Sequence, residues 1–271
     1  MNVLSVQQLG VSYGGVHALN DVSLEVGEGQ LVGLIGPNGA GKTTFVDAVT
    51  GLVASRGRVE LYGEDLTGRP PHVRARRGLA RTFQSSELFE DLTVAENLQV
   101  TADPSTWWTA LGETFGRRPS PNPAVGEALA ALGLEDLADA SAHELSQGRR
   151  KLVGVARALA ARPRIICLDE PAAGLDTTES AGLGRRLRAV ADAGTALLLI
   201  DHDMSLVMGV CDHVVVLEFG KVIASGTPAQ VRTDPAVVTA YLGASTARPA
   251  TASGTSNAGS AKTVTSTPET P

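Results

Sequence analysis

The strongest chemical signal in the sequence is one short glycine-rich stretch between an apolar run and a helix-forming segment. Its spacing, a glycine followed by four residues and then Gly-Lys-Thr, is the pattern of a phosphate-binding loop. Glycines let the backbone curl so that successive N–H groups point at phosphate oxygens, and the helix that follows adds partial positive charge. We expect Lys42 to reach the β- and γ-phosphates of ATP and the Thr43 hydroxyl to ligate Mg²⁺. The predicted loop consists of Gly36, Pro37, Asn38, Gly39, Ala40, Gly41, Lys42, Thr43 and Thr44.

Two carboxylates form the second chemical signal. Asp169 and Glu170 come directly after the apolar run Ile165–Leu168, which is typical of a buried strand. In open α/β sheets, ligands bind outside the carboxyl ends of the strands, where this pair is expected. We predict that Asp169 holds Mg²⁺, directly or through water, and that Glu170 activates the attacking water as general base. An Asp-Glu pair after an apolar run is by itself a weak signal of a catalytic site. The signal becomes specific here because a phosphate-binding loop precedes the pair in the sequence.

Parallel strands are needed to bring these segments together. A short helix is expected from near Lys42 to Gly51. Residues 92–162 change to a helical period, and Ser146 is expected to cap a helix that runs to about Ala161. The pattern predicts an α/β core with an inserted helical subdomain at about residues 92–162. Strands are expected at Val3–Leu9, Val22–Val26, Leu31–Ile35, Arg58–Leu61, Leu79–Phe83, Ile165–Leu168, Ala196–Ile200, His213–Leu217 and Val222–Ala224.

The C-terminal segment has a different composition. Residues 244–271 are mostly Ala, Ser, Thr, Gly and Pro and contain almost no large apolar side chain. Such a segment buries too little surface to offset the entropy lost on ordering. We therefore predict a folded domain over residues 1–243 and a disordered tail over 244–271, and a functional tail is the alternative.

With these two motifs, the sequence resembles the ATP-binding domain of ABC proteins, and the resemblance covers about residues 3–243. It implies a phosphate-loop NTPase core with an antiparallel β subdomain beside the helical one. Tyr13 matches the aromatic residue that stacks on adenine, although its position fits equally well with simple packing of a turn. Gln84 matches the glutamine that senses Mg²⁺ and water and contacts the membrane subunit. Asp176 matches the loop that links two active sites, and His202 matches the histidine that contacts the γ-phosphate.

A further segment, Leu145-Ser146-Gln147-Gly148-Arg149, resembles the signature loop that distinguishes ABC proteins from other phosphate-loop ATPases. The family pattern is Leu-Ser-Gly-Gly-Gln. The resemblance implies that Ser146 and Gly148 contact the γ-phosphate bound in a second ATPase subunit, again at a helix N-terminus. Gln147 and Arg149 depart from the pattern, and the effect on turnover of a cation at Arg149 is open.

Composition and charge narrow the class of protein. The net charge is -6, whereas a duplex-binding protein usually has a strongly basic face, so nucleic acid is not expected as a partner. We expect the cluster Arg74, Arg76, Arg77 and Arg81 to be a solvated helix face. Cys167 and Cys211 lie in or beside apolar runs and are expected to be buried free thiols. The sequence has no signal-peptide pattern and no run of about 18 apolar residues, so we expect membrane contact only through partner chains.

The C-terminal part of the domain indicates the subfamily. The segments Ala224-Ser225-Gly226-Thr227-Pro228 and 234–243, together with Arg81-Thr82-Phe83-Gln84, resemble the ATPases of branched-chain amino-acid importers. This implies a peripheral subunit at the cytoplasmic face of the cell membrane, bound to transmembrane permeases and to a second ATPase in a homo- or heterodimer. The alternatives are the ATPase of a urea importer, that of a lipid or lipopolysaccharide exporter, a non-transport ABC ATPase, and a weakly hydrolysing regulatory subunit.

Overall fold

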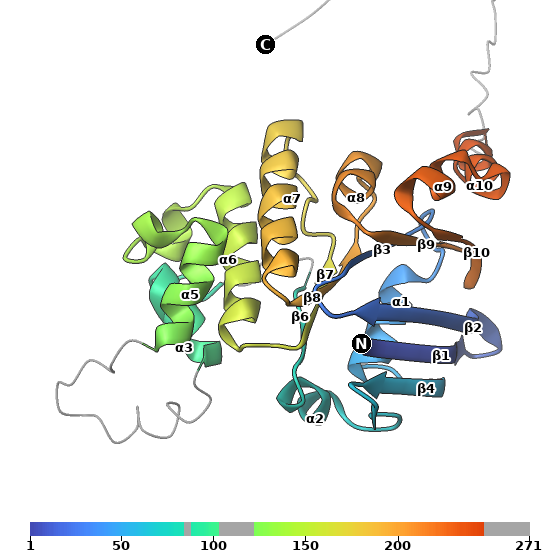
Figure 1. Cartoon of the computed structure of the whole chain (residues 1–271), viewed down its shortest axis with the longest axis horizontal. Coiled ribbons are helices and arrows are strands. Elements are labelled where there is room, and N and C mark those ends of the chain that lie inside the picture. The colour runs from blue at the N-terminus through green and yellow to red at the C-terminus, as the bar shows by residue number, and fades with distance from the viewer. Residues whose placement is uncertain (84–87, 103–121, 247–271) are drawn as a thin grey trace, which may run out of the picture.

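The computed structural model describes residues 1–83, 88–102 and 122–246, with side chains up to residue 241 (Figure 1). Gln84 and the tail residues 247–271 therefore lie outside the described part of the chain. Two sheets and a group of helices make up the architecture, and the six-stranded sheet lies between the antiparallel sheet and the helical group (Figure 1). The expected fold, an α/β core with an antiparallel β subdomain and an inserted helical subdomain, is confirmed.

The six-stranded sheet has the order β10-β9-β3-β8-β7-β6. All neighbouring pairs are parallel except the β9–β10 hairpin at one edge. Every residue of β3, β7 and β8 is buried, as is typical of strands covered on both faces. The strands are β3 (Leu31–Ile35), β6 (Leu79–Arg81), β7 (Ile165–Asp169), β8 (Ala196–Ile200), β9 (His213–Glu218) and β10 (Lys221–Gly226).

Side chains of this sheet alternate between two apolar cores. In β7, Ile165 and Cys167 belong to the core that contains helix α1 (Lys42–Thr50) and the antiparallel sheet. Ile166 and Leu168 belong to the other core, which contains α7 (Thr177–Asp192), α8 (Met204–Val210) and the helical group. The alternation follows from the two-residue period of a strand. It fixes the register of β7, because a slip by one residue would exchange the two faces.

The antiparallel sheet has the order β2-β1-β4-β5. Its two long strands extend well beyond the segments predicted from the sequence. The pairing of β1 with β2 contains register shifts between Val6 and Leu9 and again between Leu9 and Val11. These irregularities interrupt the apolar alternation on which strand prediction depends. The strands are β1 (Asn2–Tyr13), β2 (Val16–Gly27), β4 (Arg56–Leu61) and β5 (Glu64–Asp65), and α2 (Pro71–Arg76) follows them.

The helical group falls within the segment predicted to be helical. It consists of α3 (Val94–Ala102), α5 (Pro123–Leu132) and α6 (Gln147–Ala160), with single 3₁₀ turns at Glu135–Leu137 and Ala142–Glu144. Ser146 is the N-cap of α6, as expected, and its hydroxyl accepts a hydrogen bond from the N–H of Arg149 at 3.4 Å.

The C-terminal part of the domain consists of α9 (Pro228–Thr233) and α10 (Pro235–Thr246). Helix α10 thus includes the first three residues of the segment 244–271 that the sequence predicted to be disordered. Helix α7 was not predicted from the sequence, although Asp176 and Glu179 form a capping box at its start. Both cysteines are buried free thiols, as predicted, and burial raises the pKa of Cys167 to about 12.

A buried asparagine holds the start of the helical group together. Asn97 is fully buried on α3, and its Oδ1 accepts a hydrogen bond from the N–H of Phe89 at 2.8 Å. Its Nδ2 donates to the carbonyls of Phe89 and Thr93, both at 3.0 Å.

We predict that Asn97→Ala lowers the free energy of unfolding by about 2 kcal/mol, because it leaves buried backbone groups without partners. Urea denaturation of the full chain measures this change. The control is Val100→Ala on the exposed side of the same helix, which should change stability by less than about 0.5 kcal/mol. Equal losses in the two variants would contradict the role assigned to Asn97.

Candidate active site

The predicted phosphate-binding loop lies between β3 and α1 and packs tightly on its neighbours. A Cβ atom at Gly36 would lie 2.2 Å from the carbonyl oxygen of Leu217 at the end of β9. At Gly41, where φ is +104°, a Cβ would lie 2.8 Å from the carbonyl oxygen of Ala18 on β2. Only glycine fits such contacts. The shape of the loop is therefore set by its packing against β9 and β2.

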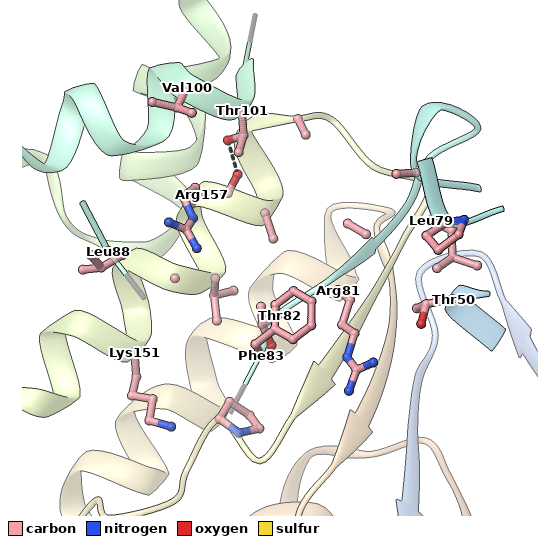
Figure 2. A pocket seen from close by; sticks show the side chains of 18 of the residues that line it. Thr50, Leu79, Arg81, Thr82, Phe83, Leu88, Val100, Thr101, Lys151 and Arg157 are labelled. Atoms are coloured by element: carbon pink, nitrogen blue, oxygen red, sulfur yellow. Dashed lines mark hydrogen bonds between the residues drawn. The ribbon is translucent and has the colours of Figure 1, made fainter. Parts of the chain in front are cut away.

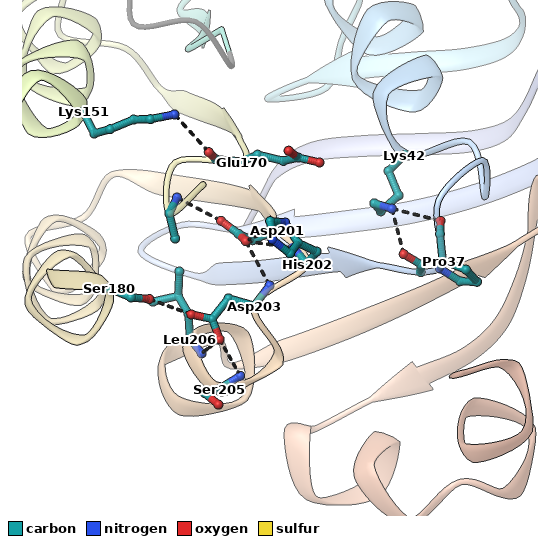
Figure 3. A network of polar contacts seen from close by, with 12 residues as sticks. Pro37, Lys42, Lys151, Glu170, Ser180, Asp201, His202, Asp203, Ser205 and Leu206 are labelled. Carbon is teal, nitrogen blue, oxygen red and sulfur yellow. Dashed lines mark hydrogen bonds and ion pairs between the residues drawn. The ribbon is translucent and has the colours of Figure 1, made fainter. Parts of the chain in front are cut away.

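Lys42 is buried inside this loop at the first position of α1. Its Nζ donates hydrogen bonds to the carbonyls of Gly36 at 2.7 Å and Pro37 at 3.0 Å (Figure 3). Burial lowers the pKa of Lys42, and the carboxylates of Glu170 and Asp169 oppose that shift. The ammonium group therefore lies within electrostatic reach of both predicted carboxylates.

The parallel ladder brings three loops to one edge of the sheet. Leu34 of β3 pairs with Ile200 of β8, and Ile200 also pairs with Asp169 of β7. The segments that begin at Gly36, Glu170 and Asp201 consequently leave the sheet side by side. This arrangement matches the expectation that the chemistry lies at the carboxyl ends of the strands.

The two carboxylates have different surroundings. Asp169 is the last residue of β7 and is 5% exposed, whereas Glu170 is half-buried. The backbone of Glu170 is in the left-handed region with φ +47°, and its N–H donates to the carbonyl of Ile200 at 2.7 Å. Residues other than glycine rarely adopt this backbone conformation unless neighbouring groups hold them in it. The contact with β8 thus helps to set the direction of the Glu170 side chain.

Asp201 fixes the loop that carries His202. It is fully buried, and its Oδ1 accepts hydrogen bonds from the N–H groups of His202 at 2.8 Å and Asp203 at 3.0 Å (Figure 3). Its Oδ2 accepts a hydrogen bond from the N–H of Ala172 at 3.0 Å. Asp201 therefore ties the loop after β8 to the loop after β7, while the His202 side chain is 62% exposed. This role of Asp201 was not predicted from the sequence.

Asp203 caps α8 and joins it to α7. Its carboxylate accepts hydrogen bonds from the Ser180 hydroxyl at 2.7 Å and from the N–H groups of Ser205 and Leu206. Burial raises the pKa of Asp203, but these hydrogen bonds outweigh it and the net shift is downward.

Lys151 links the helical group to the same edge. It is buried on α6, and its Nζ donates to the carbonyl of Glu170 at 3.4 Å (Figure 3). Burial lowers its pKa, and the carboxylates of Asp201 and Glu170 oppose that shift. This contact could not be predicted from the sequence, because Lys151 lies on α6 and Glu170 lies in the loop after β7.

Other predicted residues surround this centre. Thr43 is exposed and Thr44 is half-buried on the first turn of α1. Tyr13 is 51% exposed at the end of β1, opposite Val16 across the hairpin. Ala18 of the same hairpin contacts the loop at Gly41, so the Tyr13 hairpin adjoins the phosphate-binding loop.

The signature segment is not part of this cluster. Ser146 and Gly148 lie at the N-terminus of α6, where Gly148 packs beside Glu179 of α7. Figure 1 places α6 in the helical group, away from α1. Asp176 caps α7 by accepting hydrogen bonds from the N–H groups of Thr178 and Glu179, both at 2.8 Å. Within one chain, these residues and the phosphate-binding loop remain separate.

The arginine cluster corrects a prediction. Arg76 and Arg77 are exposed, as expected for a solvated face, but Arg74 and Arg81 are buried. The guanidinium of Arg74 donates to the carbonyls of Ala48 and Val49 at the end of α1, at 3.0 and 2.6 Å. Arg81 lies on β6, not on the helix, and its guanidinium forms ion pairs with two carboxylates.

A groove of about 680 Å³ opens beside the centre, between α3, α6 and β6 (Figure 2). Its lining is mainly apolar and includes the exposed side chains of Phe83, Phe89 and Val100. Arg81 and Lys151, which reach the site carboxylates or the backbone of Glu170, line the same groove. An apolar groove with few charged groups is typical of a binding surface for another protein segment.

The arrangement suits phosphoryl transfer to water. A glycine-rich loop at a helix N-terminus with a buried lysine is suited to bind a polyphosphate, and the segments that carry Glu170 and His202 leave the sheet at the same edge. Catalysis of this type depends on positioning and electrostatic stabilisation, which the shared sheet edge provides.

Comparisons with known proteins agree with this chemistry. The family model described as ABC transporter matches residues 19–173. The model described as branched-chain amino acid ATP-binding cassette transporter matches residues 221–247. In solved structures, the ADP conformation of MJ1267, an ATP-binding cassette of an ABC transporter, superposes with a TM-score of 0.77 at 31% identity, covering 90% of this chain and 99% of that one.

Curated relatives match over almost their whole length. The high-affinity branched-chain amino acid transport ATP-binding protein BraF of Pseudomonas aeruginosa is 41% identical over 249 residues, which cover 89% of this chain and 98% of that protein. The corresponding protein LivG of Escherichia coli K12 is 40% identical over 250 residues, with the same coverage. The lipopolysaccharide export system ATP-binding protein LptB of Acidithiobacillus ferridurans is 38% identical over 243 residues, covering 89% and 97%.

Proposed function

The chain belongs to the ABC transporter family of ATP-binding and ATP-hydrolysing subunits, and on this basis we propose that it powers the uptake of branched-chain amino acids. The observation that carries the ATPase part is the common sheet edge at which Lys42 lies within electrostatic reach of Asp169 and Glu170. The observation that favours this class of solute is the match of residues 221–247 to the branched-chain amino acid family model.

In the proposed site, the backbone N–H groups of residues 39–44 bind the phosphates of ATP at the N-terminus of α1. Lys42 exchanges the carbonyls of Gly36 and Pro37 for the β- and γ-phosphates, which offer its ammonium group full negative charges. Tyr13 stacks on the adenine from the adjoining hairpin. Gln84, which lies outside the described residues, is proposed to sense Mg²⁺ and the attacking water and to contact the membrane subunit.

The residues present also fit Mg²⁺. Asp169 and Thr43 offer a carboxylate and a hydroxyl, which are the hard oxygen ligands this ion prefers. Mg²⁺ is usually held by one or two protein groups together with substrate phosphates, and these two side chains would supply the protein groups. When bound, the ion would neutralise charge on the β- and γ-phosphates.

Glu170 is proposed to accept a proton from the attacking water, and His202 to contact the γ-phosphate. The left-handed backbone at Glu170 and its bond to Ile200 hold the carboxylate in place. Asp201 holds the His202 loop through two backbone N–H groups, so the imidazole is positioned while its ring stays exposed.

A second ATPase subunit completes each site in this proposal. Ser146 and Gly148 lie at the N-terminus of α6, and Figure 1 shows α6 in the helical group, away from α1. In a head-to-tail pair, this terminus would face the γ-phosphate held by the other subunit. Asp176, which caps α7 beside Gly148, would lie between the two sites. The second subunit is either another copy of this chain or a similar ATPase.

The apolar groove is the proposed contact for a permease (Figure 2). No helix in the described residues is long and apolar enough to cross a membrane. Because the relatives are transport ATP-binding proteins, we propose a peripheral subunit at the cytoplasmic face of the cell membrane that is held there by transmembrane permease subunits. Lipopolysaccharide export is the second candidate function, since the export ATP-binding protein LptB is 38% identical to this chain. The match of residues 221–247 favours amino-acid uptake over it.

We predict that Glu170→Gln lowers the ATP hydrolysis rate by about 10²- to 10⁴-fold, because it removes the general base. ATP binding should be retained, since the phosphate-binding loop is untouched. Phosphate release and equilibrium nucleotide binding measure the two effects, and the control is Glu25→Gln on an exposed position of β2. Unchanged hydrolysis in Glu170→Gln would contradict the assignment of the base.

A substitution at Arg149 tests whether the chain is a fully active or a weakly hydrolysing ATPase subunit. Its side chain is exposed and forms no hydrogen bond or ion pair with the described residues. We predict that Arg149→Gln keeps or raises the hydrolysis rate, because it restores the family pattern without disturbing the fold. The matched control is Arg185→Gln on an exposed position of α7. A loss of more than about tenfold would show instead that Arg149 has a direct role in turnover.

A further inference from the structure

Arg81 makes a bridge that the chemistry described above does not use. Its Nη1 donates to Oδ1 of Asp47 at 2.5 Å, and its Nη2 donates to Oδ2 of Asp169 at 2.8 Å. Asp47 belongs to α1, the helix that follows the phosphate-binding loop, and Asp169 ends β7. One guanidinium group therefore joins the two elements that carry the proposed Mg²⁺ ligands Thr43 and Asp169.

The bridge is buried. The side chains of Arg81 and Asp169 are 8% and 6% exposed, and that of Asp47 is 26% exposed. Burial lowers the pKa of Arg81, but its bonds to Asp47 and Asp169 outweigh this effect and raise it. Nε of Arg81 is buried and has no hydrogen-bond partner among the described residues. An unsatisfied buried donor of this kind costs about 1–3 kcal/mol.

Asp169 keeps one carboxylate oxygen available. Arg81 contacts Oδ2, and no described residue donates a hydrogen bond to Oδ1. A rigid planar guanidinium that holds one oxygen also fixes the plane and direction of the other. The backbone adds to this fixation, because the N–H of Asp169 donates to the hydroxyl of Thr82, the next residue after Arg81.

We propose that Arg81 is a positioning residue for Mg²⁺, which it serves by holding the Asp169 carboxylate in the orientation that presents Oδ1 to the ion. This inference rests on the proposed function, in which Asp169 is a ligand of Mg²⁺. Partners that orient a metal ligand typically change metal affinity by about 10- to 100-fold when they are removed. Without Arg81, the Asp169 carboxylate loses the guanidinium that holds Oδ2, so the direction of Oδ1 is no longer fixed.

Arg81 also lines the groove that is proposed to contact a permease. The guanidinium carbon of Arg81 lies 5.0 Å from the centre of the Phe83 ring, within range of a cation–π contact. Phe83 is 57% exposed, and both residues line the groove (Figure 2). A partner segment that displaces Phe83 would therefore act on the cation that holds Asp169.

The test measures how strongly Mg²⁺ increases affinity for the non-hydrolysable β,γ-imido analogue of ATP. Equilibrium binding to the full chain is measured with excess chelator and with saturating Mg²⁺, and the ratio of the two dissociation constants is the readout. We predict that Arg81→Met lowers this ratio by about tenfold or more. Arg81→Lys, which keeps one charge but loses the two-armed fork, should give an intermediate ratio.

Arg74→Met is the matched control. Arg74 is a second buried arginine that holds α1, but it bonds to backbone carbonyls and to no carboxylate of the site. Both methionine variants should unfold at lower temperature than the wild type, and only Arg81→Met should lose the Mg²⁺ effect. If Arg81→Met does not fold, Asp47→Asn, which removes one arm of the bridge at a partly exposed position, should lower the ratio in its place.

An unchanged or larger Mg²⁺ effect in the Arg81 variants, or an equal loss in Arg74→Met, would overturn the inference and leave the proposed function intact. A wild-type chain whose affinity did not respond to Mg²⁺ would overturn the proposed metal site and this inference with it.

Discussion

The parallel pairing of β3, β8 and β7 is the constraint on which the rest of the structure depends. Ile200 pairs with Leu34 on one side and with Asp169 on the other, so the three strands end together. The alternation of their side chains between two apolar cores prevents a slip of register. The loops that follow add a few side chains to these cores, such as Ala40 and Ala172. The loops are also held by buried polar contacts such as those of Asp201, and these contacts form only if the strands end in register.

Charge is balanced across this edge by groups from several elements. Lys42, Lys151 and Arg81 are buried or nearly buried cations, and they come from α1, α6 and β6. Each contacts or acts on Asp169 or Glu170. Buried charges are tolerated when they are paired and hydrogen-bonded. The edge therefore gathers charges that would be unfavourable singly, and it connects the helical group and the groove to the centre where ATP is proposed to bind.

The phosphate-binding loop and the Asp169–Glu170 pair could be predicted from the sequence because their signals are local. A glycine spacing and an apolar run followed by carboxylates need no knowledge of the fold. Arg81 could not be predicted, because Asp47 and Asp169 lie 34 and 88 positions away. Composition alone suggested a solvated arginine face. The lengths of β1 and β2 were underestimated because register shifts interrupt their alternation, and α7 was missed although a capping box marks its start.

We propose that the shared edge of β3, β7 and β8 assembles one Mg²⁺–nucleotide site. An experimental structure of the full chain with ADP and Mg²⁺ tests this proposal most directly. We predict the diphosphate on the backbone N–H groups of residues 39–44, Lys42 turned from the carbonyls of Gly36 and Pro37 toward phosphate, and the metal beside Thr43 on the side of Asp169. A nucleotide bound elsewhere, or a metal remote from both Thr43 and Asp169, would contradict it.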